Sequence, residues 1–278
     1  GGLWEGLSTE IDPAGRQSLH TTLRADCIGE AGLSFALHAL LTRDDASRAI
    51  AHSLQAYCFD NYQVTEPGPY SGMVRWTDTG WEVCYQDDVA RLLIPQMLAN
   101  LYLGEQRYVA ETQAALDFLV RTTGTDGTRI SRTDLVTLTE ARIAELSSQP
   151  GNFPSAHYNG FYHAALLLAA RLYDRPDYAD MAVRGLTTIM AAYPNTTREQ
   201  SETEELCRLV LPLAWLVWVT GDAQHRRWLD RVTDDLERLG HPSGAFLEWD
   251  TGYAAACSRT TGSESALLMH NGDPVVDL

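Results

Sequence analysis

Hydrophobic residues recur with helical spacing along nearly the whole chain of 278 residues, and the segments with this spacing come in pairs. A short polar turn joins the two members of each pair, so each pair is predicted to form an antiparallel helical hairpin. Gly104 and Gly221 stand at two of these turns, where a helix commonly ends in a left-handed residue. The predicted hairpins are residues 25–41 with 44–62, 87–103 with 105–121, 156–173 with 177–193, and 201–219 with 222–239.

The two members of each hairpin differ in character. First members are apolar almost all round, as in residues 164–170, whereas second members alternate apolar and charged residues, as in residues 226–236. A helix that is apolar on every side is typically buried, and an amphipathic helix faces solvent on one side. Hairpins with one inner and one outer helix predict an all-α toroid with two concentric helix rings, here a single domain over residues 1–278.

The last residues of the chain suggest the start of another helix. Asp273 is expected to cap it and Pro274 to occupy its first helical position. Four hairpins followed by the start of a fifth inner helix lead us to expect an incomplete ring, truncated at its C-terminus.

Charge and composition exclude several functions. The chain carries 21 Lys and Arg against 37 Asp and Glu, a formal charge of −16, which disfavours binding to nucleic acid or to an anionic membrane. Residues 209–220 are the longest nearly uncharged stretch, too short for the roughly 20 residues that cross a bilayer. Five widely spaced cysteines predict neither a disulfide framework nor a metal site, and no cofactor is expected. A cytoplasmic location is slightly favoured over export with a removed signal, and the oligomeric state is left open.

The segment Tyr85-Gln86-Asp87-Asp88-Val89-Ala90-Arg91, which opens a predicted inner helix, resembles the six-hairpin glycosidase superfamily. Residues 24–30, Trp215 within residues 211–216, and Asn271-Gly272-Asp273-Pro274 extend this likeness to a bacterial branch of glycoside hydrolases. The resemblance implies an (α/α)6 toroid that cleaves an oligosaccharide. Members of the superfamily that act on uronic acids, such as unsaturated glucuronyl hydrolases, make a substrate containing a uronic acid one candidate.

Glycosidic bond cleavage needs one carboxylic acid and one further carboxylate. Asp87 and Asp88 begin an inner helix, and their mutual repulsion and burial near Trp81 and Tyr85 are expected to raise the pKa of one of them. We therefore expect one of the two to be the general acid, with a slight preference for Asp88. The alternative is that one aspartate is simply the N-cap of the helix. Glu264 is a weaker candidate for the second carboxylate.

Two arginines stand near these acids in the sequence pattern. Arg24 and Arg91 are candidates for binding a carboxylate of the substrate through a bidentate contact. Pairing with acids of the protein itself is the alternative. Asp26 and Glu30 lie four residues apart and share a helix face, so they predict either a second carboxylate at the site or an ion pair with Arg24.

Aromatic residues and a histidine complete the expected substrate-binding group. Trp76, Trp81 and Tyr85 flank the aspartates and suit the apolar face of a sugar ring, although each could instead be ordinary core. His157 and Tyr158 begin the third inner helix, where His157 is either structural or a hydrogen-bond partner of a substrate.

Two other functions remain open from the sequence. A sugar isomerase resembling N-acylglucosamine epimerase would need paired histidines facing the cavity, and only His157 fits. A non-catalytic helical ring that binds carbohydrate or protein is the alternative from a different class.

The acids that open the fourth inner helix, Glu202, Glu204 and Glu205, are expected to form a solvated first turn matched to the helix dipole.

Overall fold

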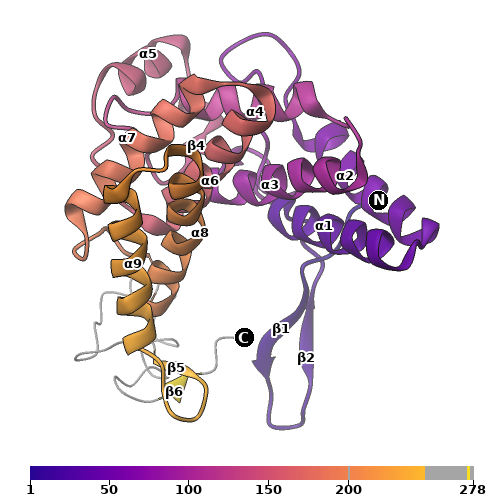
Figure 1. Cartoon of the computed structure of the whole chain (residues 1–278). Coiled ribbons are helices and arrows are strands. Elements are labelled where there is room, and N and C mark those ends of the chain that lie inside the picture. Colours follow the sequence, from indigo (N-terminus) through magenta and orange to yellow (C-terminus); the bar gives the residue numbers. More distant parts are fainter. Residues whose placement is uncertain (200, 248–273, 276–278) are drawn as a thin grey trace. The chain divides into compact units, whose positions relative to one another are not determined.

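A computed structural model of the chain describes residues 1–199, 201–247 and 274–275, and these residues are mainly helical (Figure 1). The chain forms two compact units. The first comprises residues 1–125 and 129–151, and the second comprises residues 126–128 and the chain from residue 152 onward. The expectation of a single domain over residues 1–278 remains a prediction.

The first unit contains two helical hairpins close to the positions that the hydrophobic spacing predicts, although α4 begins at Val109 rather than at residue 105. Helix α1 packs against α2, its partner in the hairpin, and against α3, the first helix of the next hairpin. Asp44 caps α2 by accepting hydrogen bonds from the backbone N–H groups of Ala46 and Ser47. Gly104 ends α3 in the left-handed conformation, with a φ of 68°. The hairpins are α1 (Ala25–Thr42) with α2 (Asp45–Tyr62), and α3 (Gln86–Leu103) with α4 (Val109–Arg121).

A glycine lets α1 and α3 approach closely near their N-terminal ends. A Cβ atom at Gly29 would lie 2.6 Å from the Cα of Leu92 and 2.7 Å from the carbonyl oxygen of Arg91. Only glycine fits there without movement of the backbone, so the first turns of the two helices are held side by side. Most residues of α3 between Gln86 and Asn100 are buried, as expected for an inner helix.

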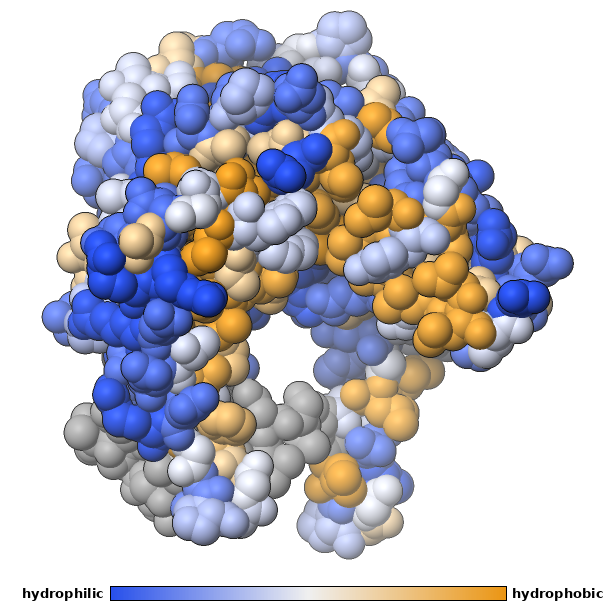
Figure 2. Space-filling model, viewed as in Figure 1, coloured by the Kyte–Doolittle hydropathy of each residue, from blue (hydrophilic) through white to orange (hydrophobic). Residues whose placement is uncertain are grey.

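The second unit repeats this arrangement. Helix α6 packs against α7 and α8, and α8 packs against α9. The outer helix α9 buries only His225 and Val232, and it presents a hydrophilic surface in Figure 2. These contacts confirm the predicted division into inner and outer helices for both hairpins of the second unit. They are α6 (Ala156–Tyr173) with α7 (Pro176–Ala192), and α8 (Glu202–Thr220) with α9 (Ala223–Arg238).

Several smaller elements have no counterpart in the sequence prediction. The antiparallel hairpin formed by β1 (Gly6–Ile11) and β2 (Gln17–His20) extends away from the helices of the first unit in Figure 1. The strands β3 (Val83–Cys84) and β4 (Thr133–Asp134) pair antiparallel, and a 3-10 turn (Leu135–Thr137) and helix α5 (Glu140–Ser148) follow them. They lie in the connections between hairpins, where short motifs without clear periodicity escape pattern analysis.

The expected helix start at Pro274 is wrong. The strand β6 (Pro274–Val275) instead pairs antiparallel with β5 (Phe246–Leu247). The fixed φ of proline is compatible with an extended chain as well as with a first helical turn, and a β-branched valine favours the extended form. Separately, no helix among the described residues is long and apolar enough to cross a membrane.

Candidate active site at the start of α1 and α3

The close contact between α1 and α3 brings two acidic side chains together. Asp26 lies in the first turn of α1 and Asp88 in the first turn of α3, and only 1% and 6% of their surfaces are exposed. Their carboxyl groups are hydrogen-bonded to each other. Such a bond requires one of the two carboxyls to hold a proton, because a carboxylate can only accept. Asp87 is also buried beside them, at 4% exposed.

Two guanidinium groups hold Asp26 as the ionised partner. Nη2 of Arg24 lies 2.7 Å from Oδ2 of Asp26, and Nη1 of Arg91 lies 3.0 Å from the same oxygen. Nη2 of Arg24 also reaches Oδ1 of Asp88 at 3.1 Å. Glu5 also belongs to this cluster, although the sequence analysis did not single it out. Its Oε1 lies 3.2 Å from Nη1 of Arg24.

Arg91 is further occupied by Glu30, whose Oε1 lies 2.7 Å from its Nε. The alternative of ion pairs within the protein is therefore realised for both Arg24 and Arg91. The predicted pairing of Asp26 with Arg24 is present as well, whereas Glu30 pairs with Arg91.

The environment sets the two aspartates apart in pKa. Burial raises the pKa of the Asp88 carboxyl, and the charges of Asp87 and Asp26 raise it further, to about 8, although Arg24 acts in the opposite direction. For Asp26 burial also favours the neutral form, but the positive charges of Arg24 and Arg91 outweigh it and lower the pKa below the usual value. At neutral pH the proton therefore resides on Asp88.

Neither aspartate caps the helix. The residue at the N-cap of α3 is Tyr85, which makes no side-chain capping bond, and Asp87 and Asp88 occupy the first turn. The N-cap alternative is therefore wrong. The first turn is instead anchored from the side, because the fully buried Arg129 donates a hydrogen bond of 2.7 Å from Nη1 to Oε1 of Gln86. Arg129 also donates to the hydroxyl of Thr133, 2.7 Å away. A lone arginine in a connecting loop gave no sequence signal for this role.

One of the expected tryptophans lies at this cluster. The ring of Trp76 meets the ring of Tyr85 edge to face, with centroids 5.0 Å apart, and the guanidinium carbon of Arg24 lies 5.6 Å from the Trp76 centroid. Trp76 and Tyr85 therefore border the acid pair, at positions from which an aromatic surface could support a sugar ring.

Trp81 lies elsewhere in the same unit. Arg75 stacks on its ring at 4.5 Å, and its ring meets that of Tyr62 edge to face at 5.5 Å. It lines a pocket whose walls include none of the aspartates discussed above. The sequence placed both tryptophans at one site because they are five positions apart, whereas the loop between α2 and α3 turns between them.

The remaining expected residues belong to the second unit or fall outside the described residues. The rings of His157 and Tyr158 are in contact, with centroids 4.8 Å apart, at the start of α6. The backbone N–H of His157 donates to Oε2 of Glu205 at 3.2 Å. Glu205 is only 3% exposed, so the expectation that it forms part of a solvated first turn is wrong. Glu264 lies outside the described residues.

Among the described residues, no group of three or more His, Cys, Asp or Glu side chains is arranged to hold a metal ion. The acid pair of the first unit is accompanied by two arginines and by the rings of Trp76 and Tyr85.

No protein-family model and no curated protein matches the sequence. Solved structures do match. One is the GH76A α-1,6-mannanase from Salegentibacter sp. HEL1_6, with a TM-score of 0.63 and 12% sequence identity over 81% of this chain and 68% of the mannanase chain. D-mannose isomerase gives a TM-score of 0.63 at 9% identity over 86% of this chain and 69% of the isomerase chain.

A third similar structure is the unsaturated glucuronyl hydrolase from Bacillus sp. GL1, which is responsible for degradation of glycosaminoglycan. Its TM-score is 0.58 at 12% identity, over 78% of this chain and 62% of the hydrolase chain. These identities establish a shared fold and no particular activity. The chain therefore shares the all-α, helical-hairpin fold of these structures, an α/α toroid, in agreement with the fold class that the sequence pattern predicts.

Proposed function

We propose that the protein is a glycoside hydrolase that cleaves an oligosaccharide with Asp88 as its general acid. The observation that carries this proposal is the buried Asp88 carboxyl, whose pKa is raised to about 8, next to an ionised Asp26. A carboxylic acid that keeps its proton at neutral pH is what protonation of a leaving glycosidic oxygen requires.

The neighbours of Asp88 stabilise it both before and after it donates its proton. Before the reaction, the carboxylate of Asp26 accepts the hydrogen bond of the protonated Asp88. After proton donation, the new negative charge on Asp88 has Nη2 of Arg24 at 3.1 Å. Asp26 itself is held by two guanidinium groups, which makes it a positioning residue rather than a nucleophile. Asp87 is then the candidate for the second carboxylate within the first unit, and Glu264 remains a weaker one.

The consecutive aspartates gain support from one of the similar structures. An inactive variant of the Salegentibacter mannanase, in which two consecutive aspartates are replaced by asparagine, was solved in complex with α-1,6-mannotriose. The present chain has three pairs of consecutive aspartates, at 44–45, 87–88 and 234–235. Of these, Asp87 and Asp88 form the pair in which both members are buried. This burial singles out the same residue pattern on physical grounds.

An uncharged sugar is the favoured substrate. A uronic acid would need a cation for its carboxylate, and both arginines of the cluster already contact acids of the protein. With Asp88 protonated, Arg24 and Arg91 face the carboxylates of Asp26, Glu5 and Glu30, so the cluster has no excess of positive charge to attract an anionic sugar.

An isomerase is less well supported, although D-mannose isomerase is among the similar structures. Moving a proton next to a carbonyl calls for a base that is unprotonated at the working pH, such as one of a pair of histidines. The groups found in contact with Asp88 are instead carboxyls and an arginine. This set matches acid-assisted hydrolysis better.

The test is a screen of aryl glycosides, including mannosides, glucosides and glucuronides, with the purified protein and two variants. Asp88→Asn is expected to lower kcat by about 10²–10⁴-fold, the usual contribution of a general acid. Asp234→Asn changes the exposed member of another pair of consecutive aspartates and serves as the matched control with full activity. Unchanged turnover of every cleaved glycoside by Asp88→Asn would remove Asp88 from the proposal.

A further inference from the structure

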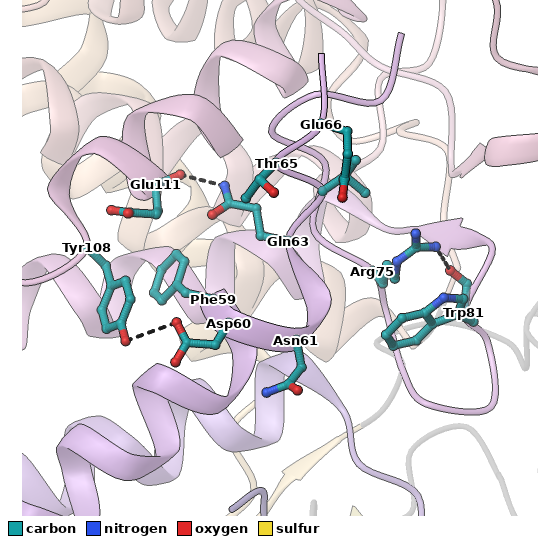
Figure 3. A pocket seen from close by; sticks show the side chains of 11 residues that line it. Phe59, Asp60, Asn61, Gln63, Thr65, Glu66, Arg75, Trp81, Tyr108 and Glu111 are labelled. Carbon is teal, nitrogen blue, oxygen red and sulfur yellow. Dashed lines mark hydrogen bonds between the residues drawn. The ribbon is translucent and has the colours of Figure 1, made fainter. Parts of the chain in front are cut away.

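A cavity lies in the first unit, apart from the acid pair. It has a volume of about 370 Å³, at the lower end of the roughly 300–1,000 Å³ typical of small-molecule sites. Figure 3 shows its side chains, which come from the end of α2, the loop that follows it and the start of α4. The lining residues are Phe59, Asp60, Asn61, Gln63, Val64, Thr65, Glu66, Arg75, Trp81, Tyr108 and Glu111.

Aromatic rings stand on both sides of this cavity. On one side the rings of Phe59 and Tyr108 are stacked, with centroids 4.7 Å apart and planes inclined by 11°. On the other side stands Trp81, which is 42% exposed although it is a large aromatic residue (Figure 3). Arg75 holds this ring in place by stacking on it and by donating a hydrogen bond of 2.6 Å to the carbonyl oxygen of Trp81. Fixed aromatic surfaces of this kind suit the apolar face of a sugar ring.

Polar groups between the rings supply hydrogen-bonding capacity. Nε2 of Gln63 donates to the carbonyl oxygens of Glu111, at 2.7 Å, and of Gly72, at 3.3 Å. These bonds fix the amide, and its Oε1 atom is buried with no hydrogen-bond partner among the described residues. A buried acceptor left unpaired is costly, and a donor from a ligand would relieve that cost. Asp60 and Asn61 are exposed at the rim.

The charges in the lining select the class of ligand. Asp60, Glu66 and Glu111 outnumber the single cation, Arg75, so an anionic ligand would be repelled. The described residues offer no metal-binding group of three acids or histidines here. Carboxylates accept strong hydrogen bonds from hydroxyl groups. The combination of aromatic walls with carboxylate and amide acceptors therefore favours a ligand that is rich in hydroxyls and carries no negative charge.

The loop between α2 and α3 serves both sites with consecutive residues. The side chain of Arg75 stacks on Trp81 in the cavity, whereas Trp76 contacts Tyr85 and Arg24 beside the acid pair. The cavity and the acid pair are thus separate in their residues but are shaped by the same loop.

We propose that this cavity is an accessory binding site for an uncharged sugar unit, with Trp81 as its stacking surface and Gln63 and Asp60 among its hydrogen-bonding groups. The choice of a saccharide rests on the proposed function, but the site does not contain the hydrolytic residues. It would retain a part of an oligosaccharide that is remote from the bond being cleaved.

The test measures binding by isothermal titration calorimetry with the full chain carrying Asp88→Asn, so that no substrate is consumed. The probes are neutral trisaccharides, namely α-1,6-mannotriose, cellotriose and maltotriose, with trigalacturonate as the charged counterpart. At least one neutral probe is expected to bind, and trigalacturonate is expected to bind at least tenfold more weakly. Adding Trp81→Ala is expected to weaken the neutral probe at least tenfold. Absence of binding by all neutral probes, or tighter binding of trigalacturonate, would overturn the proposal.

Two further variants keep the result interpretable. Trp218→Ala removes a tryptophan that is 51% exposed and stacked by Arg171 at 5.2 Å, but that lines neither site, so binding should not change. Asp60→Asn alters an exposed side chain, and asparagine can still accept the hydrogen bond that the hydroxyl of Tyr108 donates to Asp60 at 3.3 Å. This variant should also weaken binding, and it serves as the second test if Trp81→Ala proves unstable. Binding that is insensitive to both Trp81→Ala and Asp60→Asn contradicts the accessory site.

The outcomes separate this inference from the proposed function. If the unaltered protein cleaves no glycoside and the neutral probe still binds through Trp81, the proposed hydrolysis fails and the accessory site stands. If glycosides are cleaved and neither cavity variant affects binding, the accessory site fails and the hydrolysis stands.

Discussion

The two units build the contact between their inner helices in the same way. In the first unit Gly29 of α1 sits against the backbone of Arg91 and Leu92 in α3. In the second unit Gly160 of α6 sits against α8, where an added Cβ would lie 2.6 Å from the carbonyl oxygen of Arg208. A glycine facing an arginine thus marks both junctions.

Corresponding positions carry different chemistry. Asp26 and His157 each stand three residues before the glycine, and Asp88 and Glu205 each stand three residues before the arginine. Glu205 accepts hydrogen bonds from the backbone N–H groups of Glu199, at 2.7 Å, and His157, at 3.2 Å. Asp88 faces the carboxyl of Asp26 instead.

This difference separates a structural acid from a chemical one. Backbone N–H donors favour the ionised form of a carboxylate. At Glu205 two such donors also join separate chain segments. A second carboxylate disfavours ionisation, and this leaves Asp88 with a proton that it can transfer. Burial alone does not distinguish the two residues, because 6% of Asp88 and 3% of Glu205 is exposed.

The largest expected effect compares these two acids directly. Asp88→Asn should lower kcat by about 10²–10⁴-fold and keep the fold, because asparagine closely mimics a protonated aspartic acid. Glu205→Gln should keep kcat and lower the free energy of unfolding by about 1–3 kcal/mol, since it weakens hydrogen bonds to a charged group. Kinetics on a cleaved aryl glycoside and urea denaturation of both variants measure the pair of effects. The comparison breaks if Glu205→Gln is the variant that loses turnover.

The next effect concerns Asp26. Asp26→Ala leaves Arg24 and Arg91 without the buried carboxylate between them and should lower the free energy of unfolding by about 3–5 kcal/mol. His157→Ala at the corresponding position of the second unit should cost no more than about 1 kcal/mol, because there the backbone N–H of His157 makes the contact with Glu205. Urea denaturation measures both, and equal losses would contradict the contrast between the units.

Stability should depend on pH with opposite sign in the two units. In the first unit, burial and the charges of Asp87 and Asp26 raise the pKa of Asp88 from 3.8 to about 8. Between these values the folded protein holds a proton that the unfolded chain lacks. Its contribution to stability therefore falls as pH rises, by about 1.4 kcal/mol per pH unit. In thermal melts from pH 4 to 8, Asp88→Asn should no longer show this fall in stability with rising pH. A variant whose stability falls as steeply as that of the parent would count against a protonated Asp88.

In the second unit the buried His163 acts in the other direction. Burial lowers its pKa from 6.5 to about 3, and in the part of the chain that the structure describes neither ring nitrogen has a hydrogen-bond partner. Between these values the unfolded chain binds a proton that the folded chain does not. The contribution of His163 to stability therefore rises with pH, by about 1.4 kcal/mol per pH unit, and is lost as pH falls below 6.5. His163→Gln should remove this acid sensitivity in the same melts, and a variant as acid-sensitive as the parent would contradict the assignment.

The smallest expected effects test whether the two junctions are equivalent. Gly29→Ala and Gly160→Ala each place a Cβ too close to a backbone carbonyl oxygen, and each should lower the free energy of unfolding by about 1–3 kcal/mol. Gly32→Ala, in α1 where an added Cβ would meet no atom closer than 3.5 Å, controls for the loss of a glycine. If only one of the two variants has a lower free energy of unfolding, the two junctions do not contribute equally to stability.

The helical hairpins could be predicted from the sequence because their signal is local. Apolar spacing, the cap at Asp44 and the stop at Gly104 each lie within the segment that they define. Asp87 and Asp88 could be singled out for the same reason, as consecutive acids at the start of an apolar helix. The hairpins therefore followed from local pattern, as did the choice of Asp87 and Asp88 as candidate residues.

The partners of those acids were harder to predict because they depend on contacts between distant segments. Glu5 reaches Arg24 from the N-terminal segment, and Arg129 reaches Gln86 from a loop far along the chain. Trp81 was assigned to the acid pair by its proximity in sequence, but the loop carries it to another cavity. Glu205 was expected to be solvated because its hydrogen-bond donors are backbone N–H groups, which every residue except proline has and which the sequence therefore does not reveal.

The central claim is that Asp88 keeps its proton at neutral pH while Asp26 is ionised, and a carboxyl titration by ¹³C NMR tests it most directly. Spectra of the folded protein between pH 3 and 9, compared with those of Asp88→Asn, identify the signal of Asp88. The account predicts one aspartate carboxyl that titrates near pH 8 and is missing from the variant. If every aspartate carboxyl of the folded protein is ionised by pH 6, Asp88 is no acid at neutral pH and the account is contradicted.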